Sequence, residues 1–128
     1  MRVDIEQRTL RFRKPLQSSY GEVAERTIFE LEIEGADGVR GRGEAAPLAP
    51  YDGVSVGRAY AALEAYRPIL AGGDGLPGGE LLDACRAADD LPQGLAAVDM
   101  ALWDRAGKRE GKPVSALLTT DPAWAVPV

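Results

Sequence analysis

The stretch Leu95-Ala96-Ala97-Val98-Asp99-Met100-Ala101-Leu102-Trp103-Asp104-Arg105-Ala106-Gly107-Lys108 predicts a central helix over about residues 92–110. One apolar stripe at helical spacing comprises Leu95, Val98, Leu102 and Ala106. A second stripe beside it comprises Ala96, Met100, Trp103 and Gly107. We interpret Met100 and Trp103 as core candidates, so that two faces of the helix are buried. Gly111 and Pro113 then end the helix, and we expect the remaining chain to pack around it.

Three predicted strands precede this helix, over about residues 2–13, 27–35 and 38–46. In the first strand, the alternation of apolar and polar residues shifts by one position, which predicts a bulge or bend near Arg8. Pro15 is expected to end this strand. Gly41 and Gly43 in the third strand indicate close approach of another element or a bulge. Further helices are predicted over about 55–70, 79–89 and 113–118. The expected fold class is α+β, a three-stranded antiparallel meander followed by a small helical bundle.

Two irregular connections interrupt this pattern, at residues 16–25 and 46–53. A ten-residue connection is long for a hairpin, and such loops in compact domains are often functional. Exposed hydroxyl and aromatic side chains there are typical of a ligand pocket, and equally of ordinary turns. The candidate residues on these connections are Ser18, Ser19, Tyr20, Tyr51 and Asp52.

The residues that are missing exclude several kinds of catalytic site. The chain has no histidine and a single cysteine, Cys85, which excludes a Ser-His-Asp triad, a Cys-His pair and a histidine zinc site from these 128 residues. Asp99 and Asp104 are five residues apart on the helix and face different directions, so they cannot share a metal. The pattern by itself therefore supports no catalytic residue and no metal ligand in this chain.

Composition favours an ordinary globular domain. The net charge of −5 with scattered Lys and Arg argues against nucleic-acid binding. No apolar run approaches the roughly 20 residues of a membrane span, and the N-terminus lacks a signal-peptide pattern. With one cysteine, a cytoplasmic location is expected. The sequence leaves the oligomeric state open, with a homo-oligomer as one alternative.

The last residues, Ala123-Trp124-Ala125-Val126-Pro127-Val128, form an apolar run. A free C-terminus is normally polar. We therefore expect the domain to cover residues 1–122 and residues 123–128 to begin the first strand of a truncated larger unit. The alternative is a small terminal strand that packs onto the same domain.

Two motifs in order resemble a known family. They are Gly43-Glu44-Ala45-Ala46-Pro47-Leu48 and residues 96–118, which include Asp99, Trp103, Asp104, Gly107-Lys108 and Gly111-Lys112-Pro113-Val114. Both are similar to the N-terminal capping domain of the enolase superfamily, in its mandelate racemase/muconate lactonizing subgroup. This resemblance covers nearly the whole chain.

The resemblance implies a two-domain enzyme in which this domain covers the mouth of a (β/α) barrel. Its chemistry would be abstraction of a proton α to a carboxylate of a small substrate, with Mg²⁺ stabilising the enediolate and barrel lysines acting as acid and base. The catalytic residues and metal ligands would lie on the barrel, which is absent from this sequence. Lys108 and Lys112 belong to the helix-end motif and are not those lysines.

The resemblance also implies that the two irregular connections form a lid that sets substrate specificity. Ser19-Tyr20-Gly21 followed by Arg26 is similar to o-succinylbenzoate synthases and N-succinylamino acid racemases. A dipeptide epimerase and a muconate cycloisomerase remain alternatives, although dipeptide epimerases usually carry an arginine where Gly21 stands. Arg26 would touch a substrate carboxylate or hold the loop, and its position at a strand start favours the structural role. The rival class is a non-catalytic, stand-alone α+β binding module.

Overall fold

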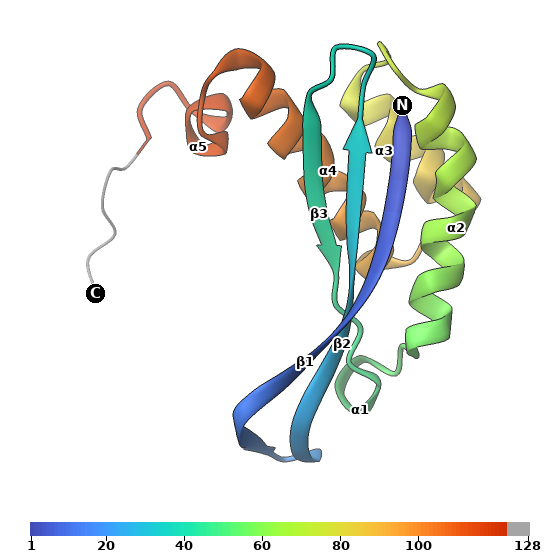
Figure 1. The fold of residues 1–128 in the computed structure, drawn as a ribbon, viewed down its shortest axis with the longest axis vertical. Coiled ribbons are helices and arrows are strands. Elements are labelled where there is room, and N and C mark those ends of the chain that lie inside the picture. Colours follow the sequence, from blue (N-terminus) through green and yellow to red (C-terminus); the bar gives the residue numbers. More distant parts are fainter. Residues whose placement is uncertain (123–128) are drawn as a thin grey trace.

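The computed structural model describes residues 1–122 as one sheet covered on one face by helices (Figure 1). The sheet has three antiparallel strands in the order β1-β2-β3. The strands are β1 (Arg2–Ser18), β2 (Gly21–Glu34) and β3 (Arg40–Ala45). The helices are α1 (Ala49–Asp52), α2 (Val56–Gly72), α3 (Gly78–Ala88), α4 (Pro92–Glu110) and α5 (Val114–Leu118). The predicted α+β class is confirmed.

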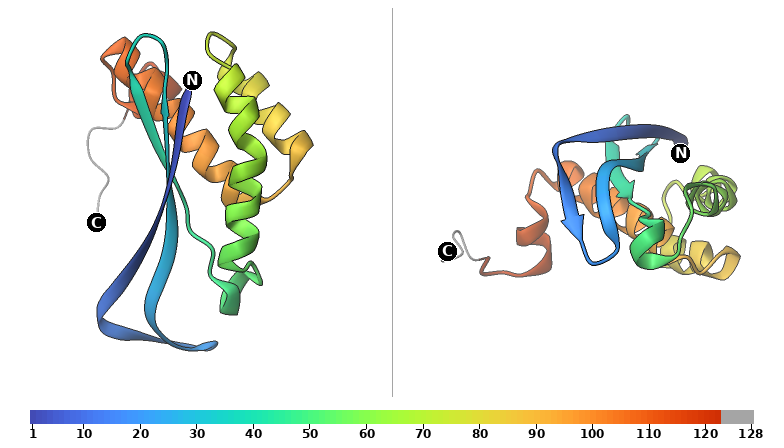
Figure 2. Two further views of the ribbon diagram at one scale, coloured as in Figure 1. Left: turned by 45° about the vertical axis from the view of Figure 1, so that its right-hand side comes forward. Right: turned by 90° about the horizontal axis from the view of Figure 1, so that it is seen from below.

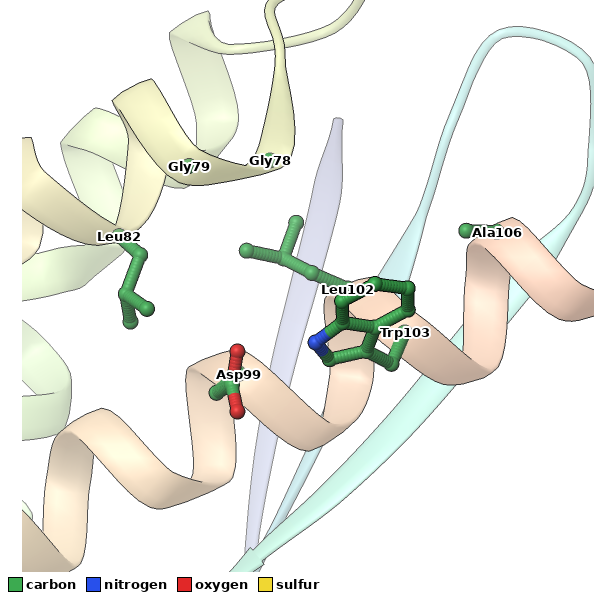
Figure 3. Close-up of a pocket in the computed structure, with 7 residues that line it drawn as sticks. All are labelled: Gly78, Gly79, Leu82, Asp99, Leu102, Trp103 and Ala106. Carbon is green, nitrogen blue, oxygen red and sulfur yellow. The ribbon is translucent and has the colours of Figure 1, made fainter. Parts of the chain in front are cut away.

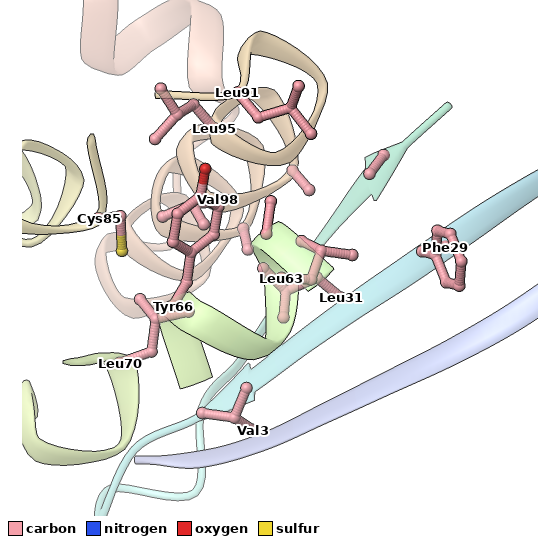
Figure 4. Close-up of a cluster of buried hydrophobic side chains, with 14 of the residues drawn as sticks. Val3, Phe29, Leu31, Leu63, Tyr66, Leu70, Cys85, Leu91, Leu95 and Val98 are labelled. Carbon is pink, nitrogen blue, oxygen red and sulfur yellow. The ribbon is translucent and has the colours of Figure 1, made fainter. Parts of the chain in front are cut away.

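The core lies between the inner face of the sheet and helices α2 and α4 (Figure 4). Phe29, Leu31 and Ile33 alternate along β2 and are buried on this face, as expected for an antiparallel strand whose other face is exposed to solvent. The opposite face of β2 carries Glu30, Glu32 and Glu34, which pair with arginines from β1 and β3. Sequence alternation therefore separates the inner from the outer face of the sheet.

Helix α4 lies directly against β3, and two glycines permit this contact. A Cβ atom at Gly41 would lie 2.0 Å from the Ala101 carbonyl oxygen, and one at Gly43 would lie 1.9 Å from that of Ala97. Both distances are far shorter than any real Cβ contact, so only glycine fits there. The pairing of β2 with β3 is regular at both positions. Close approach, rather than a bulge, explains the two glycines.

The expectation that the second stripe of α4 is buried was wrong for its large residues. Met100 is 44% exposed and Trp103 is 38% exposed. The helix instead turns Ala97, Ala101 and Arg105 toward the sheet. A short distance between helix and sheet requires small side chains at the contact, so the larger Met100 and Trp103 lie on the outer side.

The expected ten-residue loop at residues 16–25 was also wrong. Strand β1 continues to Ser18 and β2 starts at Gly21, so only two residues separate the strands. The irregularity expected near Arg8 lies later, between Arg11 and Leu16, and Pro15 falls inside it. Proline cannot donate to a ladder but is tolerated in a bulge, which is why the strand resumes after it. The paired strands form a hairpin that projects beyond the helices (Figure 2).

The strand expected at residues 123–128 lies outside the described residues. Within residues 1–122, no helix is both long and apolar enough to cross a membrane.

Candidate functional site

The end of the projecting hairpin is a tight turn that exposes an aromatic ring. The Ser18 hydroxyl donates to the Gly21 carbonyl oxygen (2.9 Å) and accepts from the Tyr20 backbone N–H (3.2 Å). These bonds close the turn, so Ser18 serves local structure. Ser19 is exposed, and Tyr20 is 59% exposed. Tyr20 is therefore the aromatic side chain that this turn exposes.

The second connection contains the short helix α1 and is closed by Asp52. The carboxylate accepts hydrogen bonds from the backbone N–H groups of Val54 (2.8 Å) and Leu48 (3.0 Å), and from the Gln93 side-chain amide (2.9 Å). Burial raises the pKa of the Asp52 carboxyl, but these three hydrogen bonds outweigh it, so the pKa is lowered from its ordinary value. The carboxylate is thus ionised and accepts three hydrogen bonds from its own domain.

Tyr51 joins this connection to the hairpin. Its ring is 69% exposed and meets the edge of the Tyr20 ring, with centroids 5.6 Å apart and an interplanar angle of 85°. Edge-to-face contacts of this kind are favourable beyond the area that they bury. The structure therefore brings together Tyr20 and Tyr51, which are 31 positions apart in the sequence. We name these two side chains the tyrosine pair.

Arg26 holds the base of the same region. Its Nη2 donates to the Ala46 carbonyl oxygen at 2.7 Å, which ties β2 to the start of the second connection. Its Nε is buried and has no hydrogen-bond partner in the part of the chain that the structure describes. The contact with Ala46 corresponds to the structural role expected for an arginine at this position.

Sequence reasoning did not single out Gln93, which the structure places beside Asp52. Its side chain lies in the first turn of α4, next to buried residues. The sequence signal for Gln93 is its place as a polar, uncharged residue between the apolar positions Leu91 and Leu95. This pattern does not identify its hydrogen-bond partner.

A separate pocket of about 290 Å³ lies between α3 and α4 (Figure 3). Its lining residues are Gly78, Gly79, Leu82, Asp99, Leu102, Trp103 and Ala106. Asp99 is the only titratable group among them, so the pocket offers no acid–base pair. The helices that form it, α3 and α4, lie away from the hairpin turn (Figure 1).

The described residues provide no group of three or more His, Cys, Asp or Glu side chains that could hold a metal ion. Lys108 donates to Asp104 (2.7 Å) and Lys112 to Glu110 (3.1 Å), which occupies both lysines in ion pairs at the end of α4. Asp104 also accepts from the Arg42 backbone N–H at 2.8 Å, so it links the helix to β3.

Comparison with known proteins identifies the fold. The family model for the mandelate racemase / muconate lactonizing enzyme N-terminal domain matches residues 2–119. The chain belongs to this family. The resemblance to the capping domain of the enolase superfamily is thereby confirmed. No curated protein sequence matches the chain.

Solved structures agree with this assignment. A protein assigned to the mandelate racemase/muconate lactonizing enzymes from Roseovarius nubinhibens is 30% identical with a TM-score of 0.84, over 98% of this chain and 35% of its own. N-succinyl Arg/Lys racemase from Bacillus cereus is 25% identical with a TM-score of 0.83, over 90% of this chain and 32% of its own. A dipeptide epimerase from Enterococcus faecalis, 20% identical with a TM-score of 0.82 over 91% of this chain and 33% of its own, shares the fold. The chain thus spans about a third of the length of these proteins.

Proposed function

We propose that this capping domain is the substrate-specificity lid of a Mg²⁺-dependent enzyme that abstracts a proton α to a carboxylate. The observation that carries the proposal is the tyrosine pair, which joins two separate connections at the projecting end of the domain. A lid of this kind excludes water from a reaction and thereby strengthens the charge interactions beneath it. Tyr20, Tyr51 and the neighbouring Ser19 are the side chains that we assign to substrate contact.

The remaining predicted site residues support the lid from within. Ser18 closes the hairpin turn, and Arg26 ties β2 to Ala46. We assign the barrel of the intact enzyme, with its acid–base lysines and its Mg²⁺ ligands, to another part of the protein. When bound there, Mg²⁺ supplies Lewis-acid stabilisation of the charge that develops on the substrate carboxylate. A magnesium complex has been solved for the Roseovarius nubinhibens protein, which supports this assignment.

Within the superfamily, we propose an o-succinylbenzoate synthase-like dehydration. The support is the resemblance of Ser19-Tyr20-Gly21, followed by Arg26, to the first loop of those enzymes. A second candidate is an N-succinylamino acid racemase, which the 25% identity to the N-succinyl Arg/Lys racemase favours.

The first experiment is to read the coding DNA beyond the codon for Val128. A frame of about 200–250 further residues, the usual size of a barrel, with a Lys-x-Lys at a strand end would support the proposal. A stop codon at that point would contradict it, because no residue for proton abstraction would remain. The full-length enzyme is then assayed for dehydration and for interconversion of N-succinylamino acid enantiomers, which separates the two candidates.

In that full-length enzyme, Tyr20→Ala and Tyr51→Ala should each raise KM about tenfold, which corresponds to about 1.4 kcal/mol of lost binding, with kcat less affected. The matched control is Leu76→Ala, an exposed apolar residue on the connection between α2 and α3. Unchanged KM and kcat in both tyrosine variants would contradict the lid.

A further inference from the structure

Asp52 receives hydrogen bonds from two directions. Val54 and Leu48, whose backbone N–H groups donate to it, flank α1, so these two bonds close the connection on itself. The third bond, from Gln93 Nε2, joins the connection to a different element, the central helix α4. A self-contained turn does not require this third bond, which fixes where the turn lies on the domain.

Gln93 is attached to a firmly seated part of the molecule. It lies in the first turn of α4, where the next two residues, Gly94 and Leu95, are buried. A Cβ atom at Gly94 would lie 2.9 Å from the Tyr66 ring, so the start of α4 packs closely against α2. A side chain from this turn therefore provides a stationary point for the more exposed connection.

The arrangement of the Gln93 amide supports a specific role. Its Oε1 is buried without a hydrogen-bond partner in the described residues. An ionised carboxylate can only accept, so Asp52 requires the amide N–H and turns the oxygen away. The hydrogen bond to Asp52 therefore fixes the orientation of the Gln93 amide and leaves its Oε1 without a hydrogen-bond partner in the described residues.

From this geometry we infer that Asp52 and Gln93 are positioning residues that hold Tyr51 against Tyr20. Tyr51 directly precedes Asp52, and its exposed ring meets Tyr20 at the hairpin turn. Anchoring Asp52 to α4 therefore sets where the Tyr51 ring lies. The inference replaces the substrate-binding role expected for Asp52 from the sequence. It rests on the proposed function only for the catalytic use of the tyrosine pair.

The test uses the 128-residue chain with labelled aromatic rings and measures nuclear Overhauser effects between rings. In the wild type, Tyr20 and Tyr51 should show a cross-peak, as should Phe29 and Tyr60, whose centroids are also 5.6 Å apart. Gln93→Met keeps the length of the side chain but removes the donor. We expect it to reduce the Tyr20–Tyr51 cross-peak several-fold and to leave the Phe29–Tyr60 cross-peak unchanged.

Two further substitutions serve as controls. Gln7→Met makes the same change at an exposed position of β1 and should retain both cross-peaks. Gln93→Lys restores an N–H donor toward the Asp52 carboxylate and should restore the Tyr20–Tyr51 cross-peak. A merely stabilising role for Gln93 would lower the unfolding temperature of Gln93→Met and leave the cross-peak intact. That result would overturn the inference.

If Gln93→Met also loses the Phe29–Tyr60 cross-peak, the domain has unfolded and Asp52→Asn decides instead. Both carboxylate oxygens of Asp52 accept hydrogen bonds, whereas an asparagine has only one acceptor oxygen. The substitution therefore removes part of the anchor, and the Tyr20–Tyr51 cross-peak should again weaken. A retained cross-peak would overturn the inference. Because these measurements involve no turnover, their failure is separate from failure of the lid, which the KM values of the tyrosine variants report.

Discussion

The two halves of the β1–β2 hairpin share an alternating sequence but lie in different surroundings. In the half next to the helices, Val3 and Leu31 are buried, and β3 pairs with β2 from Phe29 to Glu34. In the projecting half, the apolar positions have shifted by one residue, and Leu10, Phe12 and Leu16 are exposed. The sheet also narrows there, because β3 ends at Ala45, opposite Phe29, and leaves a two-stranded ribbon beyond that point.

The two halves of the hairpin differ in how they are stabilised. A two-stranded hairpin is marginally stable by itself. The projecting half is supported by individual contacts, such as Thr9 with Thr27 and Gln17 with Glu22. Regions with few buried apolar contacts open at low free energy, as elements that move over a ligand must. The packed half provides stability, and the proposed lid lies at the end of the projecting half.

The largest expected effect lies where β3 meets α4 in the packed half. Gly43→Val should lower the free energy of unfolding by about 4 kcal/mol or more, because its side chain would collide with the Ala97 backbone. The measurement is chemical denaturation. The control is Gly57→Val in α2, where no atom lies within 4 Å of the added Cβ and a change within about 0.5 kcal/mol is expected. Equal stability of both variants would refute the close packing of β3 on α4.

A direct comparison of the two halves uses the same substitution in each. Leu31→Ala should lower the free energy of unfolding by about 3 kcal/mol, because the side chain is fully buried. Leu16→Ala, at a position 56% exposed on the projecting half, should change it by less than about 0.5 kcal/mol. Similar losses in both variants would contradict the division into packed and projecting halves.

The smallest effect concerns the ion pair that attaches α2 to the packed half of β1. Arg67 donates two hydrogen bonds to Glu64 and one to the Val3 carbonyl oxygen. The Arg67 guanidinium lowers the pKa of the Glu64 carboxyl from 4.5 to about 2. Because the folded pKa lies below the unfolded one, this contribution is complete above the unfolded value and is lost as pH falls toward the folded value.

Unfolding free energies of the wild type should therefore fall between about pH 5 and about pH 2.5 by more than those of Glu64→Gln. Glu80→Gln, at an exposed position in the first turn of α3, serves as the control and should follow the wild type. Identical pH profiles for the wild type and Glu64→Gln would contradict a stabilising role for the Glu64–Arg67 pair.

Local signals in the sequence predicted much of the helical part. Gly111, predicted to end the central helix, ends α4 in a left-handed conformation with φ of 64°. Gly41 and Gly43 indicated a close approach or a bulge, and the close approach of α4 explains both. Such signals are readable because each depends on the backbone conformation or steric room of one position.

The candidate site was only partly predictable. Tyr20 and Tyr51 were identified by their place on irregular connections, but Asp52 was assigned to substrate because a carboxylate in a loop has no visible partner in the sequence. Gln93, its partner, lies 41 positions away. Pro15 by itself predicts a strand end, because its lack of an N–H is a local property. The bulge that accommodates it depends on the pairing with β2.

The sequence by itself determined the α+β class, the central helix and the family, because periodicity, caps and motifs are properties of neighbouring residues. Only the tertiary structure decided the exposure of Met100 and Trp103, the length of the projecting hairpin and the partner of Asp52. Each of these depends on contacts between segments distant in sequence. Those distant segments bury a side chain or supply its hydrogen-bond partner, and no local pattern specifies which segment does so.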